Sequence, residues 1–367
     1  MVFVVATLVV AASVPHVRRL AVRLGAEQDG GTPHGRGARR HDGRIPSLGG
    51  LAILIGWLLA VAVAMPVWSL APGEADAVLA IVLGGSLMAL LGLLDDLWEL
   101  PVAMRLAVQF VAAGVLVANG VTIGFITDYF AGADATGGSG VLFLGSTASV
   151  AITLLWVVGF TNAFNFIDGV DGLSSGVAAI GSMSLLAVAL QSGGREPSLL
   201  LLAALAGASI GFLRHNAGPA KVFMGDSGAY LIGYVLAASS ILGALKVTAT
   251  FTVAAPLVIL ALPLANIAQV TVRRLRRGDS PVVASNDHLH DLLRRQGRSE
   301  RGVVWILWLV TLTLGVAGML VARTPPAVVI VTVAITVLAI GTATTLRWLE
   351  VRREAHPNTP KAGVGGR

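Results

Sequence analysis

The sequence predicts an all-α protein, a polytopic integral membrane helical bundle with about 11 transmembrane helices. Of its 367 residues, 55% are hydrophobic and only 13% are charged, whereas roughly 25% are charged in ordinary soluble domains. The apolar residues also recur in stretches close to the 20 or so that cross a bilayer as a helix. This composition excludes a disordered chain, a nucleic-acid-binding domain and a typical water-soluble enzyme. The lack of cysteine excludes a disulfide, a thiolate nucleophile and a Cys-ligated metal.

The predicted spans follow one another along most of the chain and are separated by short polar loops. They cover residues 1–15, 48–70, 77–94, 102–119, 142–160, 175–191, 198–213, 228–245, 249–270, 303–322 and 326–346. The first stretch is short, but basic residues follow it rather than precede it, which favours a span over a signal peptide. We therefore expect one transmembrane domain over residues 1–347 and a disordered cytoplasmic tail over 348–367.

The charges predict how this bundle is oriented. An odd number of spans divides the loops into two sets, and 23 of the 26 Lys and Arg residues belong to one of them. Positively charged loops stay in the cytoplasm, so the N-terminus is expected outside and the C-terminus inside. Fifteen of the 20 acidic residues lie on the same side, and carboxylates at span ends are functional candidates by default. The cytoplasmic loops that carry the candidate site are 16–47, 95–101, 161–174, 214–227 and 271–302.

Two adjacent carboxylates, Asp95 and Asp96, end the third predicted span. Their repulsion is tolerable if a divalent cation or a cationic partner bridges them. The alternative is a solvated pair that caps the next helix.

The loop after the fifth span pairs two amides with two carboxylates, at Asn162, Asn165, Asp168 and Asp171. Residues three apart share a helix face, so each pair can converge. The glycines among them favour instead an unwound helix that exposes its backbone to a ligand. The loop holds no Lys or Arg, so a bound metal or a protonated carboxyl must offset its charge. A calcium loop is disfavoured because the EF-hand pattern is absent.

The loop before the eighth span places Asp226 between glycines, which suits a metal–phosphate site. Lys221 is a candidate to meet a phosphate as a point charge, and Phe223 is a candidate to stack on a base. Asn216 opens the loop. A plain turn is the alternative interpretation.

The loop 271–302 opens with four arginines, for which contact with anionic headgroups is the simpler interpretation. His288 and His290 lack a third nearby ligand for zinc, so hydrogen bonding to an anionic or sugar substrate is more economical. The N-terminal loop ends at Arg44, a candidate substrate-binding cation, before a tight turn at Pro46. Carboxylates, amides, histidines and cations on one membrane face suit a Mg²⁺-bound polyphosphate substrate. A Walker-type loop is absent, which disfavours ATP hydrolysis.

Taken together, these motifs resemble the polyprenyl-phosphate N-acetylhexosamine-1-phosphate transferase superfamily, especially its WecA-like branch. They occur in the family order as Ile45-Pro-Ser-Leu-Gly-Gly50, Leu94-Asp-Asp96, Asn162-Ala-Phe-Asn-Phe-Ile-Asp-Gly-Val-Asp-Gly-Leu173, Val222-Phe-Met-Gly-Asp-Ser-Gly228 and His288-Leu-His290. An eleven-span bundle with its N-terminus outside is also similar to that branch.

The resemblance implies that a polyprenyl phosphate attacks the β-phosphorus of a UDP-N-acetylhexosamine, most simply UDP-GlcNAc, and that UMP leaves. It implies Mg²⁺, with Mn²⁺ as a possible substitute, held by Asp226, Asn165 and Asp96. Asp95, Asp96 or Asp168 would accept a proton from the lipid phosphate or orient it, with direct attack or a covalent Asp intermediate left open. The residues expected around the substrates are Asp168, Asp171, Asn162, Asn216, Lys221, Phe223, Arg44, His288 and His290.

The last cytoplasmic loop departs from the family pattern. Ser285, Asp291 and Leu292 replace an Asp, a His and an Arg, and Asn266 stands where the family commonly has Asp. These changes concern the sugar and the lipid rather than the metal. The partners implied are the two substrates and the lipids of the inner (plasma) membrane, and a homodimer is left open. Three alternatives remain. The first is the UDP-MurNAc-pentapeptide transferase of peptidoglycan synthesis, whose His-His-His run this chain lacks. The second is a transporter or flippase, and the third is a non-catalytic homologue with a binding or regulatory role, because the histidine region is changed.

Overall fold

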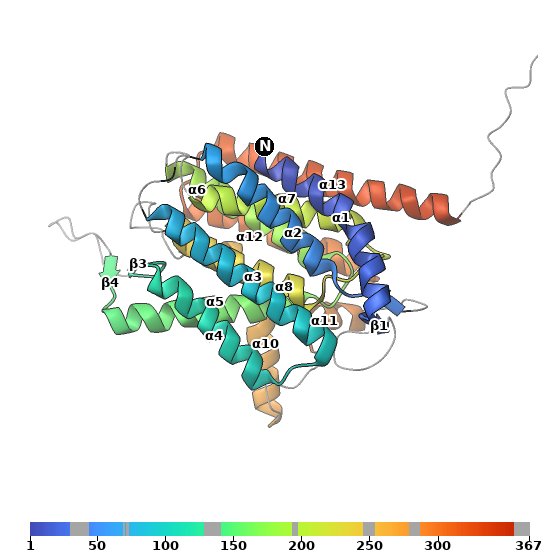
Figure 1. Ribbon diagram of the computed structural model, residues 1–367, viewed down its shortest axis with the longest axis horizontal. Coiled ribbons are helices and arrows are strands. Elements are labelled where there is room, and N and C mark those ends of the chain that lie inside the picture. Colours follow the sequence, from blue (N-terminus) through green and yellow to red (C-terminus); the bar gives the residue numbers. More distant parts are fainter. Residues whose placement is uncertain are drawn as a thin grey trace, which may run out of the picture.

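The computed structural model describes residues 1–29, 44–68, 70, 73–127, 141–192, 197–244, 254–278 and 287–355. Within these ranges the protein is mostly helical, as the sequence predicts (Figure 1). The α-helices are α1 (Val2–Leu24), α2 (Gly49–Ala64), α3 (Glu74–Trp98), α4 (Val102–Ala118), α5 (Ser146–Ile167), α6 (Leu173–Ala189), α7 (Pro197–Asn216), α8 (Gly225–Ala244), α9 (Ala254–Ile259), α10 (Ala261–Arg277), α11 (Leu289–Arg295), α12 (Glu300–Val321) and α13 (Pro326–Ala355).

Two small β-hairpins correct the all-α prediction. β1 (Glu27–Asp29) pairs antiparallel with β2 (Arg44–Pro46), and β3 (Phe125–Thr127) pairs antiparallel with β4 (Val141–Phe143). The backbone groups of these loop segments find partners across the hairpin because they have no helix to satisfy them.

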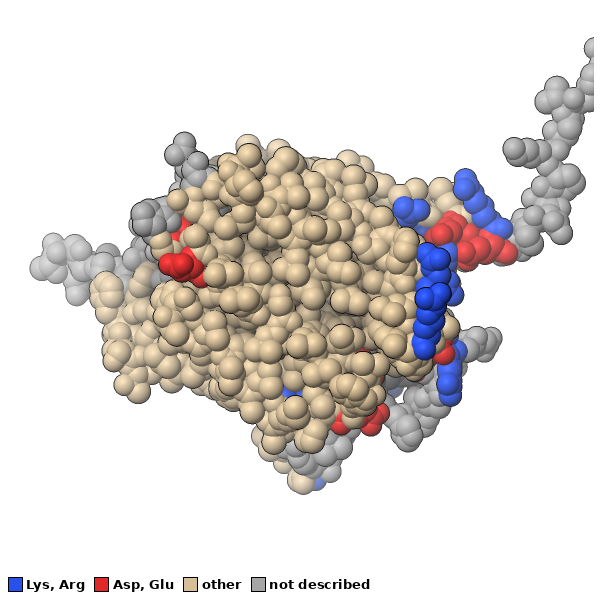
Figure 2. Space-filling model, viewed as in Figure 1, with Lys and Arg blue, Asp and Glu red and all other residues tan. Residues whose placement is uncertain are grey.

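The helices confirm a polytopic membrane protein. Seven of the described helices are long and apolar enough to cross a bilayer, and α4 and α6 are shorter apolar helices. On the face of the molecule shown in Figure 2, the surface between the two ends is almost free of charge, whereas Lys and Arg gather where α1 and α13 end. A charge-free band between polar ends is the surface that a lipid bilayer requires.

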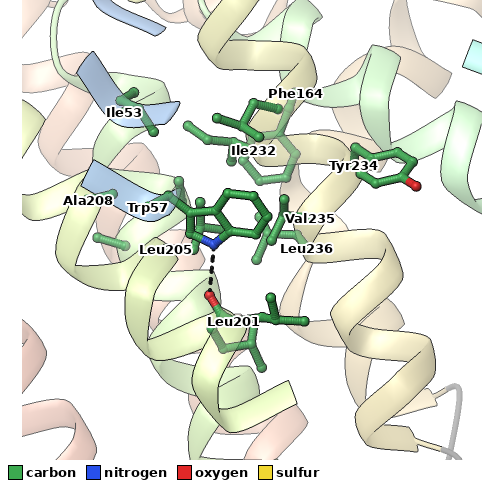
Figure 3. Close-up of a cluster of buried hydrophobic side chains, with 14 of the residues drawn as sticks. Ile53, Trp57, Phe164, Leu201, Leu205, Ala208, Ile232, Tyr234, Val235 and Leu236 are labelled. Carbon is green, nitrogen blue, oxygen red and sulfur yellow. Dashed lines mark hydrogen bonds between the residues drawn. The ribbon is translucent and has the colours of Figure 1, made fainter. Parts of the chain in front are cut away.

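The core lies between the helices and is apolar. α8 packs against α3 and α5, and α7 packs against α1 and α6. In Figure 3, Trp57 of α2 points into a cluster with Leu205, Phe164 and Ile232, and its indole N–H donates to the Leu201 carbonyl at 3.2 Å. This hydrogen bond satisfies a donor that has no access to solvent.

The ninth predicted span, 249–270, is not a single helix. α9 ends at Ile259 and α10 begins at Ala261, while residues 249–253 lie outside the described ranges. Pro263 lacks the N–H that would continue the α9 ladder to Ile259, so the chain restarts a helix at this point. α10 crosses the direction of its neighbours in Figure 1 and continues through residues 271–277, which the sequence assigned to a loop.

The predicted boundary of the tail is also wrong. α13 continues to Ala355, so residues 348–355 are helical rather than disordered. The reason lies in its last turns, where Glu350 and Glu354 pair with Lys221 of a distant loop. Residues 356–367 lie outside the described ranges.

Candidate active site

Three of the predicted site residues form a compact group, which we call the carboxylate cluster: Asp96, Asn165 and Asp226. They come from the last turn of α3, the last turn of α5 and the first turn of α8. The Asn165 amide Nδ2 donates to Asp226 Oδ1 at 2.7 Å. Asp96 accepts the backbone N–H of Asp226 at 3.0 Å and that of Ser227 at 3.3 Å. The structure therefore brings together all the residues that the resemblance assigns to the metal.

The N-terminus of α8 explains why Asp96 binds there. The first N–H groups of a helix have no partner within the helix, and they carry a partial positive charge that favours a carboxylate. Gly225 starts α8 with φ at 72°, in the left-handed region that favours glycine. A β-carbon at this position would overlap Asp96 Oδ2 and the Ser47 carbonyl. The glycine of the motif is thus needed for this close approach.

The donors of the carboxylate cluster fit a magnesium ion. They are two carboxylates and one amide, and Mg²⁺ prefers oxygen ligands. Among the described residues, no three His, Cys, Asp or Glu side chains are grouped as a complete metal cage. In magnesium sites, one or two carboxylates commonly share the ion with water and substrate phosphates.

Asp95 lies in a different environment from its neighbour Asp96. It is buried, and its Oδ2 accepts from the Arg105 guanidinium at 2.9 Å and from the Tyr230 hydroxyl at 3.2 Å. Its Oδ1 accepts the Leu100 backbone N–H at 2.9 Å. The sequence analysis missed Arg105, although a cation inside a predicted span is a signal that a partner must be nearby.

Asp168 follows the end of α5, where the helix unwinds as predicted. α5 ends at Ile167 and α6 begins at Leu173. Asp168 Oδ1 accepts the Ser174 hydroxyl at 2.7 Å, and the same hydroxyl lies 3.8 Å from Met224 Sδ. This contact places Asp168 beside the segment that leads into the carboxylate cluster. Ser174, which lies one residue beyond the motif that ends at Leu173, was not predicted as a site residue.

Asp171 and Asn216 join the two central motifs. Asp171 Oδ2 accepts the Ala220 backbone N–H at 2.9 Å. The Asn216 amide accepts from Gly172 N at 3.0 Å and donates to the Val222 carbonyl at 3.0 Å. Loop 168–172 and loop 217–224 are therefore held as one unit, and Asn216 serves as its internal bridge.

Phe223 is held between this unit and the N-terminal motif. Its backbone N–H donates to the Pro46 carbonyl at 2.8 Å, and its carbonyl accepts from Gly49 N at 2.9 Å. Its ring is only 1% exposed and clusters with Ile45 and Ala220. Because its side chain is buried, Phe223 cannot stack on a base in this conformation. Its role in binding a base stays a prediction. Arg44 lies exposed at the start of β2, two residues before Pro46.

The second group of predicted residues is the histidine cluster, which we define as His288, His290, Phe166 and Asn266. The two imidazole rings stack at 5.2 Å with an interplanar angle of 9°, and Phe166 lies 5.5 Å from the His288 ring. A β-carbon on Gly169 would overlap His290 Nε2, so the cluster lies directly against loop 168–172.

Asn266 connects the histidine cluster to α5. Its Nδ2 donates to the Phe166 carbonyl at 3.1 Å, and its Oδ1 accepts Leu289 N at 2.9 Å. An ionised Asp could accept the second bond but could not donate the first. The sequence departure at this position therefore has a structural role in this chain.

Asp291, which replaces a family histidine, belongs to α11. Its carboxylate accepts the His288 backbone N–H at 3.3 Å and lies 3.7 Å from His290 Nε2. Burial raises the pKa of the Asp291 carboxyl, against the opposing effect of His288 and Arg294. Leu292 lies in the same helix, while Ser285 lies outside the described residues.

Two predicted substrate ligands point elsewhere in the structure. The Asn162 amide donates to Gln109 Oε1 of α4 at 2.6 Å and to the Val158 carbonyl at 2.7 Å. The Lys221 ammonium lies 2.9 Å from Glu350 and 2.6 Å from Glu354. The structure thus assigns both side chains to contacts between helices or with α13, which the sequence motifs did not reveal.

The fold and the site define the class of the protein as a polytopic membrane protein with an oxygen-rich polar site at one end of its bundle. The glycosyl transferase family 4 model matches residues 78–244. The chain is 32% identical, over 86% of its length and 83% of the relative, to a probable undecaprenyl-phosphate N-acetylglucosaminyl 1-phosphate transferase of Bacillus subtilis.

Two further relatives extend the comparison. The decaprenyl-phosphate N-acetylglucosaminephosphotransferase of Mycolicibacterium smegmatis is 34% identical over 82% of the chain and 77% of the relative. A phospho-N-acetylmuramoyl-pentapeptide-transferase of Desulforamulus reducens is 33% identical over 76% of the chain and 82% of the relative. The chain belongs to the polyprenyl-phosphate N-acetylhexosamine-1-phosphate transferase superfamily, in its WecA-like branch.

Proposed function

We propose that this protein transfers N-acetylglucosamine-1-phosphate from UDP-GlcNAc to a polyprenyl phosphate. The products are UMP and a polyprenyl-pyrophosphate-linked sugar, which serves as a precursor for cell-envelope glycans. The observation that carries the proposal is the carboxylate cluster, which three helices assemble at the end of an apolar bundle. Two of the three relatives named above are described as N-acetylglucosamine-phosphate transferases of undecaprenyl or decaprenyl phosphate, which supports the same substrates here.

Mg²⁺ is the proposed cofactor, with Mn²⁺ as a substitute, and Asp96, Asn165 and Asp226 would hold it. When bound, such an ion offsets the negative charge that accumulates when two phosphorylated substrates meet. The N-terminus of α8 adds a further positive end close to the same place. The chain itself thus supplies a fixed electrostatic environment for a diphosphate.

Asp168 is the proposed proton acceptor for the polyprenyl phosphate. Asp95 is already neutralised by Arg105, and both oxygens of Asp96 accept backbone N–H groups that favour the ionised form. Asp168 is half-buried, and its Oδ1 accepts a hydrogen bond from the neutral hydroxyl of Ser174.

The remaining parts of the site fit the nucleotide and the sugar. Asp171 and Asn216 organise the loop that we assign to the nucleotide, and the histidine cluster beside Gly169 is assigned to the sugar. Arg44 is exposed at the start of β2, and we assign it to a phosphate of the substrate as a cation.

We also propose eleven spans in the inner membrane, with the N-terminus outside and the site in the cytoplasm. Among the described residues, seven long helices and two shorter ones are apolar enough to count as spans. α8 would be the tenth span, and α9 and α10 together would form the eleventh. The basic residues concentrate at the end that carries the site, which the positive-inside rule places in the cytoplasm (Figure 2).

A second candidate is transfer of N-acetylmuramoyl-pentapeptide phosphate, which the relative of that name supports. The two reactions can be separated directly. Purified protein is incubated with polyprenyl phosphate, Mg²⁺ and either UDP-GlcNAc or the UDP-MurNAc-pentapeptide, and UMP release is measured. We expect UMP release in the reaction with UDP-GlcNAc and none in the reaction with the UDP-MurNAc-pentapeptide. Release only with the pentapeptide nucleotide would select the second candidate, and release with neither would reject both.

A further inference from the structure

The C-terminal helix α13 reaches the site through a buried arginine. Arg347 is only 4% exposed. Its Nε donates to the Pro219 carbonyl at 3.1 Å, and its Nη2 donates to the same oxygen. Its Nη1 lies 3.4 Å from Glu350 Oε2. A buried guanidinium that directs two donors to one carbonyl of a distant loop fixes that peptide group in place.

The same peptide group holds Asp171. The Pro219 carbonyl and the Ala220 N–H belong to a single planar unit, so a contact that orients one end orients the other. The Ala220 N–H donates to Asp171 Oδ2 at 2.9 Å. Arg347, this peptide and Asp171 thus form a continuous chain of hydrogen bonds, in which a positive charge at one end strengthens the bond at the other.

The chain of hydrogen bonds borders a cavity of about 610 Å³. Arg347, Pro219 and Asp171 all line it, together with Trp308 of α12. Trp308 is anchored by its indole N–H, which donates to the Leu173 carbonyl at 3.2 Å. The arginine therefore lies within the same local environment as the carboxylate rather than across the molecule from it.

We propose that Arg347 is a positioning residue that sets the affinity for the UDP-sugar by holding Asp171 through the Pro219–Ala220 peptide. The inference rests on the proposed function, because it takes Asp171 as part of the nucleotide site. α13 is then a membrane helix whose cytoplasmic end completes the site without touching the substrate.

The experiment measures the Kd of UDP-GlcNAc by calorimetry on the full-length purified protein, together with KM values for both substrates. Arg347→Met is expected to weaken UDP-GlcNAc about tenfold. The KM for polyprenyl phosphate and the kcat should change less than about twofold. A general loss of folded enzyme would not raise one KM alone, so this pattern separates a positioning role from misfolding. Arg347→Lys keeps one donor for the Pro219 carbonyl and should restore Kd to within about threefold. Arg353→Met removes an exposed arginine from the same helix and is the matched control.

A double-mutant cycle tests the route of the effect. In an Asp171→Ala background, the added Arg347→Met change should weaken UDP-GlcNAc by less than about twofold, because the residue it positions is gone. An undiminished tenfold effect in that background, or an unchanged Kd in Arg347→Met alone, would overturn the inference. If Arg347→Met does not fold, a Kd for Arg347→Lys that is more than about threefold weaker than that of the wild type overturns it instead. Wild-type protein that binds UDP-GlcNAc but releases no UMP would contradict the proposed function and leave this binding test intact.

Discussion

The carboxylate cluster and the histidine cluster lie at the same end of the bundle but are held by different forces. The carboxylate cluster is bound by short hydrogen bonds between α3, α5 and the N-terminus of α8. The histidine cluster depends on ring stacking and on one amide, Asn266, which links α10 to the end of α5. The first gathers carboxylates at a helix N-terminus, and the second packs two buried imidazole rings against each other and contains few polar atoms. The difference supports our proposal that the first cluster serves the reaction centre and the second serves recognition.

The largest expected effect is at the centre of the carboxylate cluster. Asp226→Asn removes the charge that the proposed metal needs, so turnover should fall about a thousandfold while the fold is kept. UMP release and thermal stability are the measurements. Asp76→Asn, at the exposed opposite end of α3, is the matched control and should keep full activity. Wild-type turnover in Asp226→Asn would show that the reaction centre lies elsewhere.

The next prediction separates Asp95 from Asp96. Asp95→Asn leaves Arg105 with no counter-charge for its buried contact, so the free energy of unfolding should fall by about 3 kcal/mol. Asp96→Asn should instead lose activity with a smaller change in stability, because its partners are backbone N–H groups. Denaturant unfolding in detergent and UMP release measure the two effects. An Asp95→Asn variant that is inactive but as stable as the wild type would contradict this distinction between the two carboxylates.

In the histidine cluster, substitution should affect recognition more than chemistry. His290→Phe keeps an aromatic ring for stacking on His288 but removes both ring nitrogens. We expect about a tenfold loss in kcat/KM, mainly through the KM for the UDP-sugar. Steady-state kinetics with each substrate varied in turn test this. A large loss in kcat with an unchanged KM would instead place His290 at the reaction centre.

The smallest predicted effect concerns the support of the histidine cluster. Asn266→Asp keeps the shape of the side chain and the bond from Leu289 N, but loses the donor to the Phe166 carbonyl. One such hydrogen bond contributes about 1 kcal/mol, so activity should fall about fivefold. Asn266→Ala, which loses both bonds, should have a larger effect than Asn266→Asp. The reverse order would mean that the amide does not position the cluster.

Much of the fold was predictable because each membrane helix is encoded by a local stretch of apolar residues. The long apolar stretches correspond to helices α1 to α8, α12 and α13, although α1 and α13 each continue nine residues beyond the predicted end and α5 continues seven. The break between α9 and α10 was not predicted, although Pro263 was a visible signal. The extension of α13 through residues 348–355 had no local signal, because its partner Lys221 is remote in the chain.

The candidate site was predictable to the extent that its residues stand in dense motifs. Asp96, Asn165 and Asp226 were grouped by the resemblance, and the structure places them within hydrogen-bonding contact. The contacts of Asn162 and Lys221 with Gln109 and Glu354 were not predicted. Such contacts depend on which helices become neighbours, and hydropathy does not encode that choice.

The sequence by itself determined that this is a membrane protein, the rough position of most of its helices and the identity of its polar motifs. These properties follow from composition and local spacing, because each apolar stretch must satisfy its own backbone within lipid. Only the tertiary structure decided the roles within the motifs. It directed Asp95 to Arg105 and Asp96 to the N-terminus of α8, although the two are adjacent in the chain. Successive helix residues face different neighbours, so the packing of α3 against α4 and α8 gave two identical side chains different chemistry.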